Sequence, residues 1–218
     1  MSDFQSQGGL IVERDGAVQV ITLDRPAAGN TVDLPLSRAL MLAAIACDRD
    51  DDVRAVLLRS NGRFFCAGGD IGQFGQAGDA LPGQLLELTA LLHSATARFA
   101  RMNKPLVTAV QGFAAGAGLG LAIMGDIVIA GEAAAFTPAY AGIGLSPDAG
   151  ATWLLPRLVG LRRAQQMMLL NTKLDAQAAL AAGLVTEVVP DDRLQDHALA
   201  IAQRLAAGPT AAFARTRA

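Results

Sequence analysis

Two glycine-rich turns, each following a short strand-like apolar run, are the segments of this sequence that are best suited to chemistry. The first reads Phe65-Cys66-Ala67-Gly68-Gly69-Asp70, and the second runs from Gly112 to Gly120. Small residues in such turns let a ligand approach the backbone, and they leave N–H groups free to face an anion. One such turn is more typical of ordinary helix–sheet packing. The pair predicts N–H donors that meet around a negatively charged atom.

Two competing interpretations of these turns are a dinucleotide site and a helix cap. The dinucleotide pattern G-x-G-x-x-G fails, because Leu121 stands where its third glycine belongs. Asp70 stands just before a helical pattern that begins at Ile71, and an aspartate there is typical of an N-cap. For Asp70 taken alone, the cap is the favoured interpretation.

Asp148 is a lone carboxylate at the head of an apolar helix, in the string Ser146-Pro147-Asp148-Ala149-Gly150. A structural role explains it in part, because serine caps helices, proline favours their first position and an acid suits their positive end. Together with two anion-binding turns, a single carboxylate also suits a proton carrier, which takes a proton from one atom and returns it at another. We therefore expect Asp148 to be catalytic.

Other residues with reactive side chains have simpler interpretations. His93 and His197 each fall in an amphipathic helix, where a surface or packing role is the usual one. Cys66 lies inside the first turn and is expected to be a small packing residue, since no basic partner adjoins it in sequence. Cys47 and Cys66 lack a metal-ligand spacing, and no metal site is expected.

The composition predicts one soluble domain without nucleic-acid or membrane partners. The 218 residues are 52% hydrophobic with a formal net charge of −2, and the 18 basic residues are scattered rather than clustered. The uncharged stretch 105–125 is long enough to span a bilayer, but it begins as a strand and breaks at Gln111-Gly112. The first residues lack the features of a signal peptide, and the two cysteines suit a reducing compartment, so we expect a cytoplasmic protein.

Strand and helix patterns alternate along the chain and would position the turns. The Asp15-Gly16 pair predicts a hairpin between strands at 10–14 and 18–24. Further strands are predicted at 55–58, 106–110, 127–130, 134–136 and 184–189, and helices at 34–48, 85–102, 117–124, 175–182 and 192–207. This order predicts an α/β fold with parallel crossovers.

Four segments together resemble the crotonase superfamily, the enoyl-CoA hydratase/isomerase group of acyl-CoA enzymes. They are Leu23-Asp24-Arg25-Pro26 with Asn30, then 65–71, then 104–126, and finally Gly142-Ile143-Gly144-Leu145 with Pro147. The resemblance covers nearly the whole chain. It implies a spiral of repeated β-β-α units over 1–190, and a helical oligomerisation region that starts at 191–218, where the chain stops short of the helices that usually follow. It also implies a homotrimer or a dimer of trimers.

The resemblance further implies a site for an acyl-CoA thioester. Its oxygen would be held by the backbone N–H groups of Ala67 and Ala117, and coenzyme A would arrive with the substrate, so no separate cofactor is expected. Ala27 would lie along the adenine. The other implied substrate contacts are Gly68, Gly69, Asp70, Ile71, Gly116, Gly118 and Tyr140.

The sequence departs from the family's hydratases, which position water with two glutamates. Gly120 and Tyr140 stand at those positions, and Asp148 stands where isomerases and aryl-CoA dehalogenases carry a working aspartate. The string 144–157 is especially similar to the ring-epoxide isomerases of phenylacetyl-CoA degradation. We therefore expect isomerisation of an unsaturated or ring-epoxide acyl-CoA. Three alternatives stay open: a hydratase that recruits water by other means, an aspartate nucleophile that attacks an aryl-CoA, and a non-catalytic acyl-CoA-binding scaffold.

Overall fold

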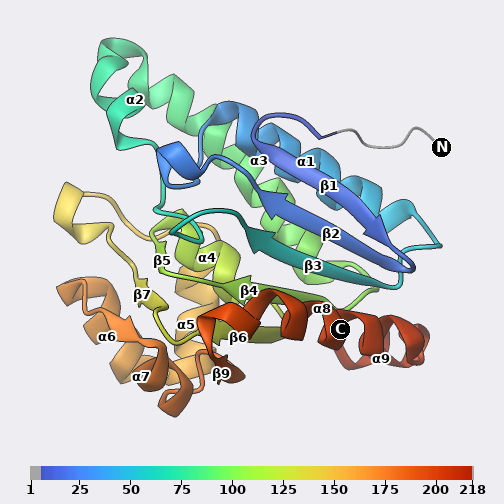
Figure 1. Ribbon diagram of the computed structural model, residues 1–218. Helices are drawn as coiled ribbons and strands as arrows, with labels where there is room; N and C mark the ends of the chain where they lie inside the picture. The colour runs from blue at the N-terminus through green and yellow to red at the C-terminus, as the bar shows by residue number, and fades with distance from the viewer. Residues whose placement is uncertain (1–5, 218) are drawn as a thin grey trace.

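A six-stranded sheet forms the centre of the computed structural model, which describes residues 6–217 (Figure 1). Its strands lie in the order β1-β2-β3-β4-β6-β9. β1 and β2 form the predicted antiparallel hairpin, and every later neighbour pairs in parallel, as the crossover pattern predicts. The strands are β1 Leu10–Asp15, β2 Val18–Leu23, β3 Ala55–Ser60, β4 Leu106–Val110, β6 Ile127–Gly131 and β9 Glu187–Val189.

A smaller sheet, in the order β5-β7-β8, lies beside the first and gives the chain its repeated unit. β5 Phe113–Ala115 and β7 Ala135–Thr137 are parallel, and β8 Leu174–Asp175 is antiparallel to β7. Each of β4 and β6 is followed by a strand of this smaller sheet and then by a helix, α4 Ala117–Ile123 or α5 Ala151–Val159. These β-β-α units agree with the spiral that the resemblance implies.

Alternate residues of the central sheet face two separate cores. Val56 and Leu58 belong to the larger core, which they share with α1 Leu34–Arg49 and α3 Leu81–Arg101. Ala55 and Leu57 face the other side, where α8 Leu194–Ala207 covers the sheet. Residues 191–218 therefore include a helix that completes this second core, while their expected part in subunit assembly stays a prediction.

The remaining helices surround these layers. They are α2 Ile71–Gln76, α6 Leu161–Leu170, α7 Ala176–Ala181 and α9 Thr210–Arg217. Two differences from the prediction have local causes. The strand expected at 184–189 is shortened, because Gly183 has a φ of 76° and Leu184 N–H donates to the Ala179 carbonyl oxygen of α7 at 2.9 Å. β5 is absent from the prediction because it lies inside the second glycine-rich turn.

The uncharged stretch 105–125 is divided among β4, β5 and α4. Across residues 6–217, no helix combines the length and the apolar character that a membrane crossing requires. The turn at Gln111-Gly112 ends β4, as the sequence indicates.

Candidate active site

The two glycine-rich turns lie side by side and are joined by backbone hydrogen bonds. Cys66 N–H donates to the Phe113 carbonyl oxygen at 3.1 Å, and Ala115 N–H donates to the Cys66 carbonyl oxygen at 3.0 Å. Glycine is required where they touch, because a Cβ on Gly118 would lie 2.2 Å from the Cys66 carbonyl oxygen. The fold thus brings together two turns that are far apart in sequence.

At least one N–H group of each turn lacks an acceptor among residues 6–217. The Gly68 carbonyl oxygen accepts from Val32 N–H at 2.7 Å. Because the C=O and N–H of a trans peptide point in opposite directions, Gly69 N–H points away from Val32. The Gly116 carbonyl oxygen accepts from the third residue of α4 at 3.0 Å, so Ala117 N–H likewise points out of the helix start.

The Ala67 N–H group was expected to hold the thioester oxygen. In the structure it already donates to the Gly29 carbonyl oxygen at 3.0 Å. Asn30 strengthens the same junction, since its Nδ2 donates at 2.9 and 2.8 Å to two carbonyl oxygens of the 61–64 loop. The bond from Ala67 ties the first turn to the loop before α1. Gly69 N–H is therefore the better placed donor of the first turn.

A cavity of about 280 Å³, the turn cavity, lies between the two turns and α3. Most of its wall is apolar, and Asp148 is the one carboxylate that lines it among the described residues. Eight of the residues expected at the site line this cavity. Its full lining is Val32, Ala67, Gly68, Gly69, Ile71, Phe74, Leu85, Leu88, Thr89, Leu92, Gly116, Ala117, Ala139, Tyr140, Ile143, Leu145, Ser146 and Asp148.

Three residues expected to contact the substrate do not line the turn cavity. Gly118 instead packs on the backbone of the first turn. The Asp70 carboxylate accepts from Gln73 N–H at 3.1 Å, so the N-cap interpretation is confirmed. Ala27 belongs to a short 3-10 helix, Pro26–Ala28, and is exposed outside the cavity.

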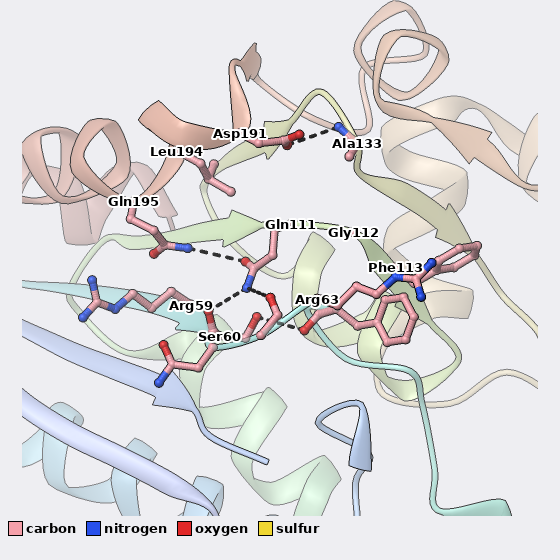
Figure 2. A pocket seen from close by; sticks show the side chains of 13 residues that line it. Arg59, Ser60, Arg63, Gln111, Gly112, Phe113, Ala133, Asp191, Leu194 and Gln195 are labelled. Carbon is pink, nitrogen blue, oxygen red and sulfur yellow. Dashed lines mark hydrogen bonds between the residues drawn. The ribbon is translucent and has the colours of Figure 1, made fainter. Parts of the chain in front are cut away.

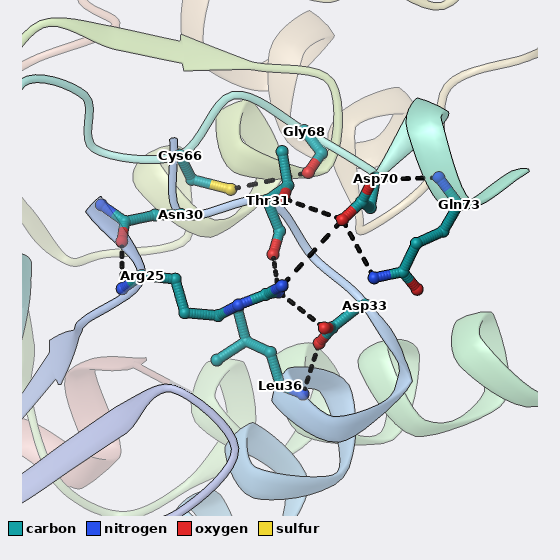
Figure 3. Close-up of polar contacts among 9 residues, drawn as sticks. All are labelled: Arg25, Asn30, Thr31, Asp33, Leu36, Cys66, Gly68, Asp70 and Gln73. Carbon is teal, nitrogen blue, oxygen red and sulfur yellow. Dashed lines mark hydrogen bonds and ion pairs between the residues drawn. The ribbon is translucent and has the colours of Figure 1, made fainter. Parts of the chain in front are cut away.

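Arg25 joins the loop before α1 to the first turn (Figure 3). Its guanidinium lies 2.7 Å from the Asp33 carboxylate and 4.0 Å from the Asp70 carboxylate, and it donates to the Thr31 carbonyl oxygen at 2.7 Å. Asp33 and Asp70 are the N-caps of α1 and α2, so Arg25 holds the starts of both helices together. Because Gly69 directly precedes Asp70, the same network supports the Gly69 peptide.

The Asp148 carboxylate lies between a tyrosine and a histidine from other parts of the chain. The Tyr140 hydroxyl donates to Oδ1 at 2.5 Å, and His93 Nε2 lies 3.3 Å from Oδ2. Burial and, next, the charge of Asp148 raise the pKa of Tyr140 above its usual value. The phenol therefore keeps its proton at neutral pH. Its hydroxyl orients the Asp148 carboxylate by donating a hydrogen bond to it.

His93 is the site residue that the sequence analysis missed. Its side chain is 48% exposed, so the expected surface position is correct, but its ring also contacts Asp148. The two residues are 55 positions apart, and nothing in the local pattern of α3 separates this histidine from a solvent-facing one. His197 lies on α8 and pairs with Glu187 at 2.7 Å, in agreement with its expected surface role.

Both positions at which the resembled hydratases carry glutamates adjoin the Asp148 segment. Tyr140 binds Asp148 directly, and a Cβ on Gly120 would lie 2.6 Å from the Cβ and the carbonyl oxygen of Ala149. Ala149 has a φ of 47°, an unusual conformation for a residue with a side chain. The Asp148-Ala149 segment therefore fills the space that a longer side chain at Gly120 would need.

A separate cavity of about 660 Å³ opens where β3 and β4 end beneath α8 (Figure 2). Gln111 Nε2 donates to the Ser60 carbonyl oxygen at 2.6 Å, and Gln195 Nε2 donates to Gln111 Oε1 at 3.5 Å. Ala133 N–H donates to Asp191 Oδ1 at 3.2 Å. None of its lining residues lines the turn cavity, and its polar side chains serve to join the strand ends to α8.

Comparison with known proteins places the chain in a family. The model of the enoyl-CoA hydratase/isomerase family matches residues 13–218. The 1,2-epoxyphenylacetyl-CoA isomerase of Escherichia coli is 40% identical over 195 residues, which are 88% of this chain and 74% of that protein. A Rhodobacter capsulatus protein named "Probable enoyl-CoA hydratase" is 43% identical over 198 residues, which are 91% of this chain and 75% of that one.

A solved structure supports the same placement. An enoyl-CoA hydratase from Mycobacterium avium subsp. paratuberculosis superposes with a TM-score of 0.87 and 35% identity, covering 96% of this chain and 82% of that one. Sequence, fold and the paired turns agree, and the protein is therefore a member of the enoyl-CoA hydratase/isomerase family of acyl-CoA enzymes.

Proposed function

We propose that this protein isomerises an acyl-CoA through a thioester enolate, with Asp148 as the proton carrier. The observation that carries the proposal is that Asp148 is the one carboxylate on the turn cavity among the described residues. Gly69 N–H and Ala117 N–H would hold the thioester oxygen. Removal of a proton from the α- or γ-carbon sends the electron pair towards that oxygen, and return of a proton at the other carbon completes the isomerisation.

The two N–H groups are suited to the enolate because they are already oriented and lack an acceptor among residues 6–217. Preformed donors stabilise developing negative charge more in the transition state than in the ground state, and each contributes roughly 3 kcal/mol. Arg25 and the glycines of the two turns keep these donors in place. Their arrangement costs no reorganisation when the charge appears.

Isomerisation fits the remaining residues better than hydration does. A hydratase of the glutamate type needs two carboxylates to position water, whereas Gly120 has no side chain and Tyr140 keeps its proton at neutral pH. The raised pKa of Tyr140 makes it a donor to Asp148 rather than a second base. One carboxylate that both takes and returns a proton is sufficient for an isomerase.

The substrate is proposed to be an unsaturated or a ring-epoxide acyl-CoA. The apolar lining of the turn cavity, with Phe74, Leu88, Leu92 and Leu145, suits a hydrocarbon or aromatic acyl group. The similarity to the Escherichia coli epoxyphenylacetyl-CoA isomerase supports the aromatic option. We also propose that Ala27 lies along the adenine, because the exposed 3-10 helix that contains it leads into the junction at the first turn.

A second candidate reaction is nucleophilic attack by Asp148 on an activated aryl-CoA, and the observation that favours it is the contact with His93. Asp148 would form an ester with the ring carbon as halide leaves, and water would then cleave the ester at its carbonyl carbon. His93 Nε2 is close enough to the carboxylate to take the proton of that water. The 2.5 Å hydrogen bond from Tyr140 weakens the case, because it reduces the nucleophilicity of the carboxylate.

A panel of four substrates tests the proposal directly: a 3-enoyl-CoA, the ring epoxide of phenylacetyl-CoA, a 2-enoyl-CoA and 4-chlorobenzoyl-CoA. We expect isomerised product from one of the first two, with a loss of about 10²- to 10⁴-fold in Asp148→Asn. Asp79→Asn is the matched control, since Asp79 is an exposed acid. Hydration alone would support the hydratase alternative, and a covalent adduct on Asp148 would support the nucleophile. Binding without any turnover would support a scaffold and overturn the proposal.

We further propose that the subunits assemble as a homotrimer or a dimer of trimers. Large apolar side chains are exposed on α5 and α6, among them Trp153 at 63% and both Leu169 and Leu170 at 73%. Burial of such side chains in a subunit interface would remove apolar surface from water. Light scattering during size-exclusion chromatography measures the mass of the assembly, and a monomer at all concentrations would contradict this expectation.

A further inference from the structure

Asp148 is reached from two sides. Besides the turn cavity, it lines a second cavity of about 630 Å³, the α3–α5 cavity, whose wall includes His93, Thr96, Arg101, Met124 and Trp153. Asp148 is the only residue that lines both cavities among those described. The carboxylate therefore separates a space suited to the acyl group from a space that His93 borders.

The two oxygens of the carboxylate have different partners. Oδ1 accepts from the Tyr140 hydroxyl at 2.5 Å, while Oδ2 lies 3.3 Å from His93 Nε2. Tyr140 is 8% exposed, whereas the His93 side chain is 48% exposed. Oδ2 is thus the oxygen whose proton has an exposed acceptor within reach.

The hydrogen bonds of His93 Nε2 define two states that differ in whether this nitrogen carries a proton. Ala149 N–H donates to Nε2 at 3.3 Å, which requires a lone pair on that nitrogen. Contact with an ionised Asp148 Oδ2 at 3.3 Å instead requires a proton on Nε2. One nitrogen cannot satisfy both partners at once, so the ring suits a proton that comes and goes between Nε2 and Oδ2.

We propose that His93 exchanges the catalytic proton of Asp148 with solvent through the α3–α5 cavity. This inference rests on the proposed isomerisation. Asp148 Oδ2 takes a proton from the substrate carbon and leaves the electron pair on the enolate. Oδ2 passes that proton to His93 Nε2, and the imidazolium releases the same proton from Nε2 to water in the α3–α5 cavity. Nε2 then takes a different proton from this water and passes it to Oδ2, which delivers it to the other carbon.

The exchange through His93 determines whether the hydrogen delivered to the product comes from the substrate or from solvent. Without His93, the carboxylate would carry one and the same proton between the two carbons inside the turn cavity. With His93, the proton delivered to the product comes from solvent. His93 is therefore a proton-exchange residue that acts through Asp148, and it decides the origin of the delivered hydrogen rather than whether the reaction occurs.

The test is isomerisation of an unlabelled 3-enoyl-CoA in heavy water, with deuterium in the product measured by mass spectrometry during the initial-rate period. We expect deuterium in most product molecules of the wild type. In His93→Gln, which keeps hydrogen-bonding groups but cannot carry the proton, deuterium per turnover should fall about tenfold or more, while kcat changes by less than that. His197→Gln is the matched control, since His197 lies on α8 away from both cavities.

Further outcomes separate this inference from the proposed function. Product without deuterium in the wild type, or equal deuterium in the wild type and His93→Gln, would overturn the role of His93 and leave the isomerase intact. Absence of isomerised product from every substrate would instead overturn the proposed function. If His93→Gln is poorly folded by thermal unfolding, His93→Ala with added imidazole replaces it. Imidazole should restore deuterium incorporation, and its failure to do so in a folded variant would contradict the exchange route.

Discussion

The Tyr140 hydroxyl donates a hydrogen bond of 2.5 Å to Asp148 Oδ1. Tyr140 stands at one of the two glutamate positions of the resembled hydratases, and in this protein its hydroxyl orients the Asp148 carboxylate. Gly120 stands at the other glutamate position and packs against Ala149, the next residue after Asp148. Gly120, Tyr140 and the Asp148-Ala149 segment therefore form one connected structural unit.

Tyr140 should resist ionisation in the folded protein. Its pKa is raised by burial and by Asp148, and it is the single tyrosine, so tyrosinate absorbance reports this group alone. The unfolded chain ionises near a pKa of about 10, so this group lowers the free energy of unfolding only as the pH rises above about 10. Tyr140→Phe should therefore lose stability less steeply above that pH. Tyrosinate that appears in the folded protein near pH 10 would contradict the expectation.

Gly120→Glu should fail to create a hydratase. The new Cβ would lie 2.6 Å from Ala149 and would displace the Asp148 segment, with an overpacking cost of about 1–3 kcal/mol. We expect loss of Asp148-dependent turnover and a lower unfolding temperature. Gly83→Glu is the matched control, because a Cβ on Gly83 meets nothing within 4 Å. Efficient hydration of a 2-enoyl-CoA by the Gly120 variant would show that the space is available after all.

Arg25→Lys should lower kcat more than it changes KM. A lysine cannot reach Asp33, Asp70 and the Thr31 carbonyl together, and hydrogen bonds of charged groups contribute about 1.5–3 kcal/mol each. A Gly69 N–H group that is held less firmly would stabilise the enolate less, while it would change the binding of the substrate little. We therefore expect a larger effect on kcat than on KM. Arg38→Lys is the control, since Arg38 forms an exposed pair with Glu87. Equal effects of the two substitutions on kcat would argue against the network.

Neither cysteine should react with alkylating reagents in the folded protein. Burial raises the pKa of Cys47 and of Cys66 to about 12, and both thiols are free and buried. Thiol quantification at slightly alkaline pH should find almost no reaction without denaturant and two thiols per chain with guanidinium. If one thiol of the native protein reacted rapidly and activity were lost at the same time, Cys66 would be accessible and the expectation would be wrong.

Much of the fold follows from local sequence patterns. The Asp15-Gly16 turn, the apolar runs of β3, β4 and β6 and the amphipathic pattern of α1 predict these elements close to their observed bounds. Periodicity determines which face of a helix or strand is apolar, and that local property does not depend on distant contacts. The short strand β5 was not predicted because it lies within the second glycine-rich turn, where periodicity is absent.

The sequence by itself identified the two glycine-rich turns and Asp148 as candidate site residues, since residue types and turn patterns are local, and the structure places all three on one cavity. Only the tertiary structure decided which N–H group is free, because the Ala67 donor is taken by Gly29 from another loop. It also brought His93 to Asp148 across 55 residues. Such pairings depend on how the parallel strands and α3 pack, and no local pattern encodes the distance between two side chains on different elements.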